Sequence, residues 1–314
     1  MQLALGTAAL GRPQYINIRQ ESCDNSNLNT FREQSFGVLE EAYNLGIRYF
    51  DTAPGYGLAE ELVLEWLNTK NDNTIEIGTK WGYTYTANFD ANATVHEVKE
   101  HSFKKLNEQW FFSKQLLPYL KVYQIHSATL ETGVLENTAV LEELMFLKKE
   151  HHLKIGLTTT GANQVEVIKK ALAILVDGKP VFDLFQVTYN FLDQSLLKVL
   201  EELNRLKKSI VIKEALANGR VFRNENYTHY NKMYTALESI AAKHNVGVDA
   251  ICLKYCVQTI PKSTILSGVS SIKQLHQNLK MNSFTLSSTD IETLNSFKIS
   301  ADAYWSERKQ LQWN

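Results

Sequence analysis

Four polar side chains of types that move protons each end, or closely follow, a short apolar segment of the chain: Asp51, Tyr56, Lys80 and His126. A tyrosine hydroxyl, with a free pKa of about 10, is a poor acid or base at neutral pH. A neighbouring ammonium stabilises the phenolate form, and a carboxylate beside that ammonium keeps it charged and oriented. Lys80 and Asp51 have the residue types for these two roles, so Tyr56 could give a proton to a carbonyl oxygen or take one from an alcohol.

His126 adds a ring nitrogen that can hold the same oxygen and stabilise the charge that develops on it. None of the four groups can donate a hydride, and no set of metal ligands accompanies them in the sequence. The chemistry therefore requires a redox cofactor, most simply a nicotinamide dinucleotide. Each residue alone also fits a structural role, such as a turn cap, a surface lysine or a core histidine. Their joint occurrence after three successive apolar segments favours a shared site.

Short apolar segments of β-strand type alternate with amphipathic segments from one end of the chain to the other. The predicted strands are Leu3–Thr7, Tyr49–Thr52, Ile75–Lys80, Lys121–His126, Lys154–Thr158, Leu184–Tyr189, Ser209–Glu214 and Thr264–Val269. The predicted helices are Phe31–Leu45, Glu60–Leu67, His96–Gln109, Val140–Lys149, Val165–Val176, Ser195–Leu206 and Tyr234–His244. This alternation indicates a (β/α)8 barrel of the TIM type, in which the carboxyl ends of the strands share one face and would bring the four side chains together.

Alternation alone could also give an open doubly wound sheet. A dinucleotide-binding sheet of that kind has a glycine-rich turn of fixed spacing after its first strand and an acidic residue ending the second. Here the first strand runs into Gly6-Thr7-Ala8-Ala9-Leu10-Gly11, whose glycines have the wrong spacing, and Asp51 is followed by Thr52-Ala53-Pro54-Gly55-Tyr56. The barrel is therefore the favoured interpretation, as a single domain over residues 1–314.

Two segments exceed a minimal barrel. The connection Arg12–Asn29 is polar and too long for an ordinary strand-to-helix loop, so it is predicted to be a lid or substrate loop. The segment Leu286–Asn314 has a helical pattern followed by aromatic residues, and we expect it to extend over the barrel mouth. Candidate pocket residues, chosen by position, are Trp81, Tyr85, Ser127, Tyr189, Trp305 and Trp313.

The composition is that of an ordinary globular protein, with 44% apolar and 21% charged residues among 314. A formal net charge of −1 argues against a general nucleic-acid or membrane-surface binder. No membrane span or signal peptide is visible, so a cytoplasmic location is expected. Three cysteines are too few for a disulfide framework, and Cys252 and Cys256 are expected to be small buried residues rather than a metal or redox pair.

The segment from Gly46 to Gly57, G-I-R-Y-F-D-T-A-P-G-Y-G, resembles the Asp-to-Tyr motif of the aldo-keto reductases. Gly78-Thr79-Lys80 and Tyr123-Gln124-Ile125-His126 are similar to the lysine and histidine segments of that family, and the resemblance covers essentially the whole chain. It implies a (β/α)8 barrel that reduces a small aldehyde or ketone, sugar-like ones included, with NADPH. It also implies that the four polar residues act as a catalytic tetrad and that the protein is a monomer.

The same resemblance implies a set of cofactor contacts. Thr159 and Gln186, on strands five and six, would bind the nicotinamide carboxamide, and Lys213 stands where many members stack an aromatic ring on the nicotinamide. The turn after strand seven would wrap the pyrophosphate with Ala215, Leu216, Gly219 and Arg220. A helix N-terminus after strand eight would hold the adenosine end with Gly268, Ser270, Ser271, Gln274, Gln277 and Asn278.

The chain departs from the family pattern in three places. Thr159-Thr160 replaces a frequent Ser-Asn pair, and Thr160 cannot copy an amide. Lys213 would disfavour an oxidised nicotinamide if it pointed at the ring. Gln274 replaces an arginine that many members carry at the adenosine phosphate, so NADH is not excluded, although Lys273 could compensate.

Two other function classes stay open on the sequence alone. The departures also fit a cofactor-binding regulatory or interaction protein that keeps the barrel but turns over little. A metal-dependent barrel hydrolase would need clustered ligands such as His-x-His at a strand end, and His126 has no such neighbour. The adjacent pair His151-His152 lies at the end of a charged helical segment, where solvent exposure is the expected state.

Overall fold

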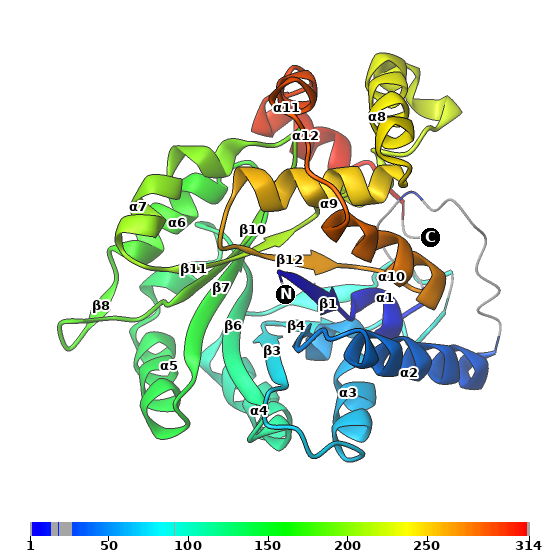
Figure 1. Cartoon of the computed structure of the whole chain (residues 1–314). Coiled ribbons are helices and arrows are strands. Elements are labelled where there is room, and N and C mark those ends of the chain that lie inside the picture. The colour runs from blue at the N-terminus through cyan, green and yellow to red at the C-terminus, as the bar shows by residue number, and fades with distance from the viewer. Residues whose placement is uncertain (1, 14–17, 19–26, 91, 313–314) are drawn as a thin grey trace.

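Eight parallel strands form a closed barrel in the order β1-β12-β11-β10-β7-β6-β3-β2 (Figure 1). The computed structural model describes residues 2–13, 18, 27–90 and 92–312. Because β1 pairs with both β2 and β12, the open sheet is excluded and the predicted barrel is confirmed. The barrel strands are β1 (Leu3–Gly6), β2 (Tyr49–Asp51), β3 (Glu76–Trp81), β6 (Leu120–Ala128), β7 (Lys154–Thr159), β10 (Leu184–Thr188), β11 (Ser209–Lys213) and β12 (Thr264–Ser267).

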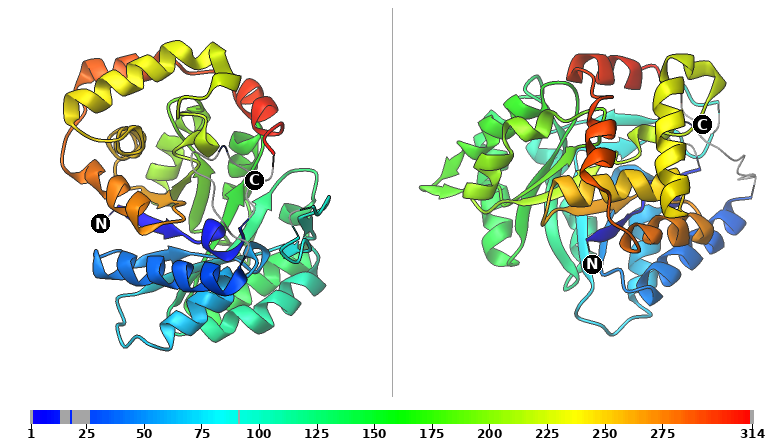
Figure 2. Two further views of the ribbon diagram at one scale, coloured as in Figure 1. Left: turned by 90° about the vertical axis from the view of Figure 1, so that its right-hand side faces the viewer. Right: turned by 45° about the horizontal axis from the view of Figure 1, so that its top comes forward.

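Helices surround the barrel, as both views of Figure 2 show. They are α1 (Ala8–Gly11), α2 (Leu28–Asn44), α3 (Ala59–Leu67), α4 (Phe103–Ser113), α5 (Thr138–Glu150), α6 (Gln164–Leu172), α7 (Leu200–Arg205), α8 (Asn231–His244), α9 (Val248–Thr259), α10 (Ile272–Leu279), α11 (Ser288–Asn295) and α12 (Ala301–Arg308). Two small hairpins, β4 (Tyr83–Tyr85) with β5 (Glu97–Lys99) and β8 (Leu175–Val176) with β9 (Lys179–Pro180), lie outside the barrel sheet. No helix in the described part of the chain is both long and apolar enough to span a membrane.

The predicted helix His96–Gln109 is wrong in its first part. Residues Glu97–Lys99 form β5, which pairs antiparallel with β4. The helix begins only at Phe103, because Ser102 adopts an extended backbone and its hydroxyl accepts a hydrogen bond from the Lys105 amide at 3.1 Å. A serine in this position caps a helix and marks its first turn.

Alternate strand residues face the barrel axis and form layers of different polarity. The layer toward the amino ends of the strands is largely apolar, and its members are Tyr49, Val122, Leu184, Val211 and Leu266. The next layer is polar and is linked by hydrogen bonds among Asp51, Lys80, Gln124 and Gln186. The polar groups that the sequence singles out therefore lie at the carboxyl ends of the strands, directly above a largely apolar layer of the barrel interior.

The C-terminal segment reaches over the barrel mouth, as the sequence predicts. The Tyr304 hydroxyl of α12 donates to Glu214 Oε2, just after β11, at 2.9 Å, and Asn190 Nδ2 donates to the Tyr304 oxygen at 3.1 Å. These bonds fix α12 against the carboxyl ends of two barrel strands. Most of the predicted lid Arg12–Asn29 lies outside the described residues, as does the pocket candidate Trp313.

Tyr56 is positioned by a close approach of two backbone segments. It ends the 3-10 turn η1 (Pro54–Tyr56), and the Leu58 amide donates to the Gly11 carbonyl at 2.8 Å. A Cβ on Gly11 would lie 1.9 Å from the Tyr56 carbonyl oxygen, so only glycine fits. Gly57 has φ +63° and approaches Gly11 from the other side.

We therefore expect Gly11→Ala to lower the free energy of unfolding by roughly 1–3 kcal/mol, because the added methyl must push the Tyr56 turn away. Gly37→Ala is the matched control, since a Cβ on this α2 glycine meets nothing within 4 Å. The control should stabilise the protein by about 0.5–1 kcal/mol through helix propensity. Urea denaturation measures both, and a Gly11→Ala protein as stable as the wild type would contradict the tight packing.

Candidate active site

A buried ion pair occupies the centre of the polar layer. Lys80 Nζ lies 2.5 Å from Asp51 Oδ2 and also donates to the Thr52 carbonyl at 2.9 Å. The two side chains are 0% and 2% exposed. Burial lowers the pKa of Lys80, and the Asp51 carboxylate opposes that effect. The Asp51 carboxylate therefore stabilises the charged form of Lys80, which burial disfavours.

The second oxygen of Asp51 is also engaged. Gln186 Nε2 donates to Oδ1 at 2.8 Å, and Gln124 Nε2 lies 3.4 Å from the same atom. Strands β2, β3, β6 and β10 thus converge on one carboxylate. A buried charge that accepts several hydrogen bonds is held rigidly, because any displacement leaves donors unpaired.

The aromatic ring of Tyr56 lies beside the ammonium of Lys80, with Nζ 4.6 Å from the ring centroid. The Tyr56 hydroxyl oxygen lies 3.4 Å from His126 Nε2, and the two rings meet edge to face. All four residues that the sequence selects are therefore brought together, at the carboxyl ends of β2, β3 and β6.

His126 faces the barrel axis by alternation with Val122 and Gln124, and β6 becomes irregular just beyond it. The pairing of β6 with β7 shifts register between Ile125 and Ala128, and Ser127 has φ +55°. The Ser127 amide donates to Thr158 Oγ1 at 2.7 Å. This bulge interrupts the regular pairing of β6 at the rim of the barrel, directly after His126.

His126 is a neutral imidazole at physiological pH. Burial, with a further contribution from the Lys80 charge, lowers its pKa well below the usual range. Among the described residues its Nδ1 has no hydrogen-bond partner, so Nε2 can carry the proton and point it at a ligand oxygen. His101 Nε2 lies 2.9 Å from the His126 carbonyl oxygen, which can only accept, so this nitrogen donates. Burial lowers the pKa of His101 to about 4, so it is neutral too.

Three neighbours of the tetrad are absent from the sequence prediction. They are His101, Tyr83, whose ring centroid is 4.7 Å from that of His126, and Arg12, whose Cζ is 5.5 Å from the Tyr56 ring centroid. Arg12 Nη1 donates to the Gly55 carbonyl at 3.1 Å and to Glu97 at 2.8 Å. The β4–β5 hairpin supplies two of these contacts, through Tyr83 and Glu97. The helix predicted from His96 onward does not anticipate this hairpin.

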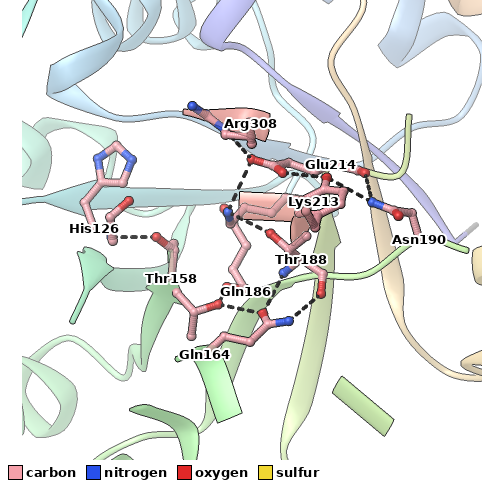
Figure 3. Close-up of polar contacts among 12 residues, drawn as sticks. His126, Thr158, Gln164, Gln186, Thr188, Asn190, Lys213, Glu214 and Arg308 are labelled. Carbon is pink, nitrogen blue, oxygen red and sulfur yellow. Dashed lines mark hydrogen bonds and ion pairs between the residues drawn. The ribbon is translucent and has the colours of Figure 1, made fainter. Parts of the chain in front are cut away.

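The residues assigned to the nicotinamide differ in how many of their side-chain polar atoms already have hydrogen-bond partners. Gln186 faces the barrel axis and uses its amide nitrogen on Asp51, while no donor among the described residues reaches its Oε1. Thr159 is fully buried, and its hydroxyl donates to Gln164 Oε1 at 3.1 Å. Lys213 faces the axis, with Nζ 3.2 Å from Thr188 Oγ1 and 3.9 Å from Glu214 Oε1 (Figure 3).

The turn after β11 is built on backbone strain and a buried arginine. Glu214, Ala217 and Asn218 have positive φ angles of 57°, 46° and 55°. Arg220 is 0% exposed, and its guanidinium donates to the Tyr304 carbonyl at 3.1 Å and to Glu307 at 2.8 Å. Arg220 thus ties this turn to α12, and its predicted pyrophosphate contact stays a prediction. The other residues assigned to this turn are Ala215, which is buried, and Leu216 and Gly219, which are partly exposed.

The N-terminus of α10 follows β12 at the same face of the barrel. Ser271 caps the helix by accepting from the Gln274 amide, and Gln274 Oε1 in turn accepts from the Ser270 amide at 2.9 Å. Asn278 is buried and donates to Ser267 at 2.9 Å. A Cβ on Gly268 would meet nothing within 4 Å, so this side of the loop is open. Gln277 is exposed.

This donor set fits a nicotinamide dinucleotide. A helix N-terminus with free approach at Gly268 suits a phosphate group, because its backbone amides point outward and the helix dipole favours an anion. The free acceptor Oε1 of Gln186 suits a carboxamide. Both lie on the rim that carries the tetrad.

The pocket candidates chosen by position do not all face the mouth. Trp81 is 0% exposed and packs against His101, and the Tyr189 hydroxyl donates to Thr259 of α9 at 3.0 Å, so both belong to the packing around the barrel. The ring of Trp305 lies 5.5 Å from Lys213 Nζ at the mouth. Tyr85 and Ser127 are partly exposed near it.

No cluster of three or more His, Cys, Asp or Glu side chains suited to a metal ion occurs in the part of the chain that the structure describes. Cys252 and Cys256 are fully buried on α9, and burial raises the pKa of both thiols. A buried neutral thiol is a small apolar residue rather than a nucleophile.

The sequence profile described as "Aldo/keto reductase family" matches residues 2–299. The chain is 23% identical over 310 residues to the uncharacterized oxidoreductase YqkF of Bacillus subtilis, covering 90% of this chain and 93% of the relative. It is also 23% identical over 290 residues to the NADH-specific methylglyoxal reductase of Escherichia coli, covering 82% of this chain and 86% of the relative. The holo form of the aldo-keto reductase AKR11C1 from Bacillus halodurans shares the fold, with a TM-score of 0.69 at 21% identity over 96% of this chain and 93% of that chain.

The profile spans nearly the whole chain, and the barrel carries the Asp, Tyr, Lys and His groups that first suggested the family. The chain belongs to the aldo/keto reductase family, whose members are oxidoreductases that use nicotinamide cofactors.

Proposed function

We propose that the chain reduces an aldehyde or ketone to an alcohol with NADPH or NADH, and that Tyr56 is the proton donor. The observation that carries this proposal is the grouping of the Tyr56 hydroxyl, His126 Nε2 and the Lys80 ammonium around one point of the barrel mouth. A carbonyl oxygen placed there would accept hydrogen bonds from both Tyr56 and His126. Small, polar carbonyl compounds, sugar-like ones included, are the substrates we propose.

A reduced nicotinamide, when bound, supplies the hydride that the carbonyl carbon requires. His126, held neutral by burial, directs an N–H toward the carbonyl oxygen and stabilises the negative charge that develops there. Tyr56 gives its hydroxyl proton to that oxygen. The Lys80 ammonium stabilises the resulting phenolate, and Asp51 keeps the ammonium in place.

NADPH is the cofactor that the family resemblance favours, and the chain's own residues keep NADH open. Gln274 is a neutral amide whose side-chain oxygen accepts from the Ser270 amide, so this position offers no positive charge to an adenosine phosphate. The Escherichia coli relative is named as NADH-specific. Gln186 Oε1 would accept from the carboxamide, and the α10 N-terminus would bind the phosphate at the adenosine end. Nothing in the comparisons favours the regulatory alternative.

Replacing Tyr56 by Phe removes the proton and leaves the ring beside Lys80. We expect kcat/KM for carbonyl reduction to fall by about 10²–10⁴-fold, while the affinity for the reduced cofactor is unchanged. Loss of reduced-nicotinamide absorbance measures the first quantity, and fluorescence titration measures the second. Tyr43→Phe is the control, because that hydroxyl bonds Asp72 outside the barrel. Near wild-type turnover by Tyr56→Phe would refute the assignment.

The ion pair should behave as one unit in unfolding experiments. Asp51→Asn or Lys80→Met leaves a buried charge without its partner and should each cost roughly 3–5 kcal/mol. The double variant should lose clearly less than the sum of the two. The exposed helical pair Lys104 and Glu108 is the comparison, with an expected coupling of about 0.3–0.5 kcal/mol. Strictly additive losses at Asp51 and Lys80 would mean that the pair is not coupled in solution.

Lys213 should discriminate between the redox states of the cofactor. A cation at this wall of the mouth repels the positive ring of the oxidised nicotinamide and leaves the neutral reduced ring unaffected. Lys213→Met should therefore raise the affinity for NADP⁺ relative to NADPH by about 10-fold. Lys121→Met, at the amino end of β6 and away from the mouth, is the control and should leave this ratio unchanged. Calorimetric titration with both cofactor forms gives this ratio, and an unchanged ratio in Lys213→Met would place the ammonium away from the ring.

A further inference from the structure

Arg308 reaches the barrel mouth from the last turn of α12 and has unused hydrogen-bonding capacity. Its Nε lies 3.4 Å from Glu214 Oε1, and its Cζ lies 5.9 Å from the Trp305 ring centroid. Among the described residues no acceptor reaches Nη1 or Nη2, although the side chain is only 19% exposed. The guanidinium is thus anchored through Nε, and its two terminal nitrogens are left to form a fork.

The Glu214 carboxylate that anchors Arg308 has other partners as well. Glu214 Oε2 already accepts from Tyr304 at 2.9 Å, and Oε1 is shared between Arg308 and Lys213. One carboxylate therefore serves two cations. Asp193, the other carboxylate that acts on Lys213, accepts from the amide and hydroxyl of Ser195.

Arg308 lies across the mouth from the tetrad. Its partner Glu214 directly follows β11, which stands four strands from β3 in both directions around the closed barrel. Figure 3 shows Lys213, Glu214 and Arg308 grouped together, with His126 on the other side. The positive charges of Lys80, Arg12 and Lys213 contribute to the low pKa of His126, although each is paired with a carboxylate.

From this arrangement we infer that the carbonyl substrate carries an anionic oxygen group, a carboxylate or a phosphate, and that Arg308 binds it while Tyr56 and His126 hold the carbonyl oxygen. A guanidinium with two free nitrogens on one edge matches the two oxygens of such a group in a bidentate pair. This inference rests on the proposed carbonyl reduction for its substrate, but the binding of the anion can be measured without any turnover.

The test compares aldehydes of similar shape and different charge on the cofactor-loaded protein. 4-Carboxybenzaldehyde and 4-formylphenyl phosphate are the anionic probes, and the methyl ester of the first is the neutral one. The wild type should have a higher kcat/KM for an anionic probe than for the ester, and the two anionic probes tell carboxylate from phosphate. In Arg308→Gln this preference should fall by about 10–100-fold, mainly through a higher KM for the anionic probes.

Two further variants keep the result interpretable. Arg308→Lys retains the charge without the fork, so it should recover part of the preference. Arg223→Gln removes an exposed arginine that pairs with Glu238 and should leave the preference unchanged. Thermal unfolding of each variant shows whether α12 stays docked, since α12 is also held by Arg220 and Tyr304.

Binding of benzoate and benzamide to the cofactor-loaded protein separates the two proposals. If no aldehyde is reduced but benzoate binds more tightly than benzamide, and only with Arg308 present, the proposed function fails and the anion site stands. If aldehydes are reduced with equal preference for acid and ester, and Arg308→Gln changes neither ratio nor benzoate affinity, the anion site is overturned and the proposed function stands.

Discussion

The buried ion pair of Lys80 and Asp51 is the constraint on which the rest of the site depends. Two charges inside a barrel are stable only when their hydrogen-bonding capacity is nearly filled, because each ion gives up its hydration on burial. Lys80 meets this demand with Asp51 and the Thr52 carbonyl, and Asp51 meets it with Lys80 and Gln186. Gln186 is 135 residues from Asp51 in the sequence, and Lys80 is 29 residues from it. A closed barrel with its register fixed is therefore needed to assemble them.

A second constraint, the close approach of two backbone segments, explains the glycines at the turn that carries Tyr56. The Tyr56 ring lies beside Lys80, at the end of η1, where η1 comes close to the backbone of α1. The space between these segments is too small for a Cβ on Gly11. Arg12 then closes the turn by donating to the Gly55 carbonyl. The close backbone approach thus helps to fix the position of the Tyr56 ring beside the Lys80 ammonium.

Local patterns predict the barrel and the tetrad because both follow from strand ends. A parallel strand is an apolar run with a clear end, and the residue after it lies at the functional face. The β4–β5 hairpin escapes prediction, since its strands are short and polar and the cap at Ser102 is the only local signal of where α4 begins. Tyr83, His101 and the inward turn of Gln186 toward Asp51 arise from tertiary contacts across the barrel. No spacing rule along the chain encodes these contacts.

The two walls of the mouth are held by separate networks, and this separation has a consequence for how the protein can change. The tetrad wall is fixed by side-chain bonds among β2, β3, β6 and β10, whereas the opposite wall is fixed by Arg220 and Glu214 bonding to α12. No hydrogen bond among the described residues joins Arg308 to a tetrad side chain. Substitutions on α12 can therefore alter which substrates the mouth binds. The Lys80–Asp51 ion pair and the Tyr56 hydroxyl beside it would be unchanged.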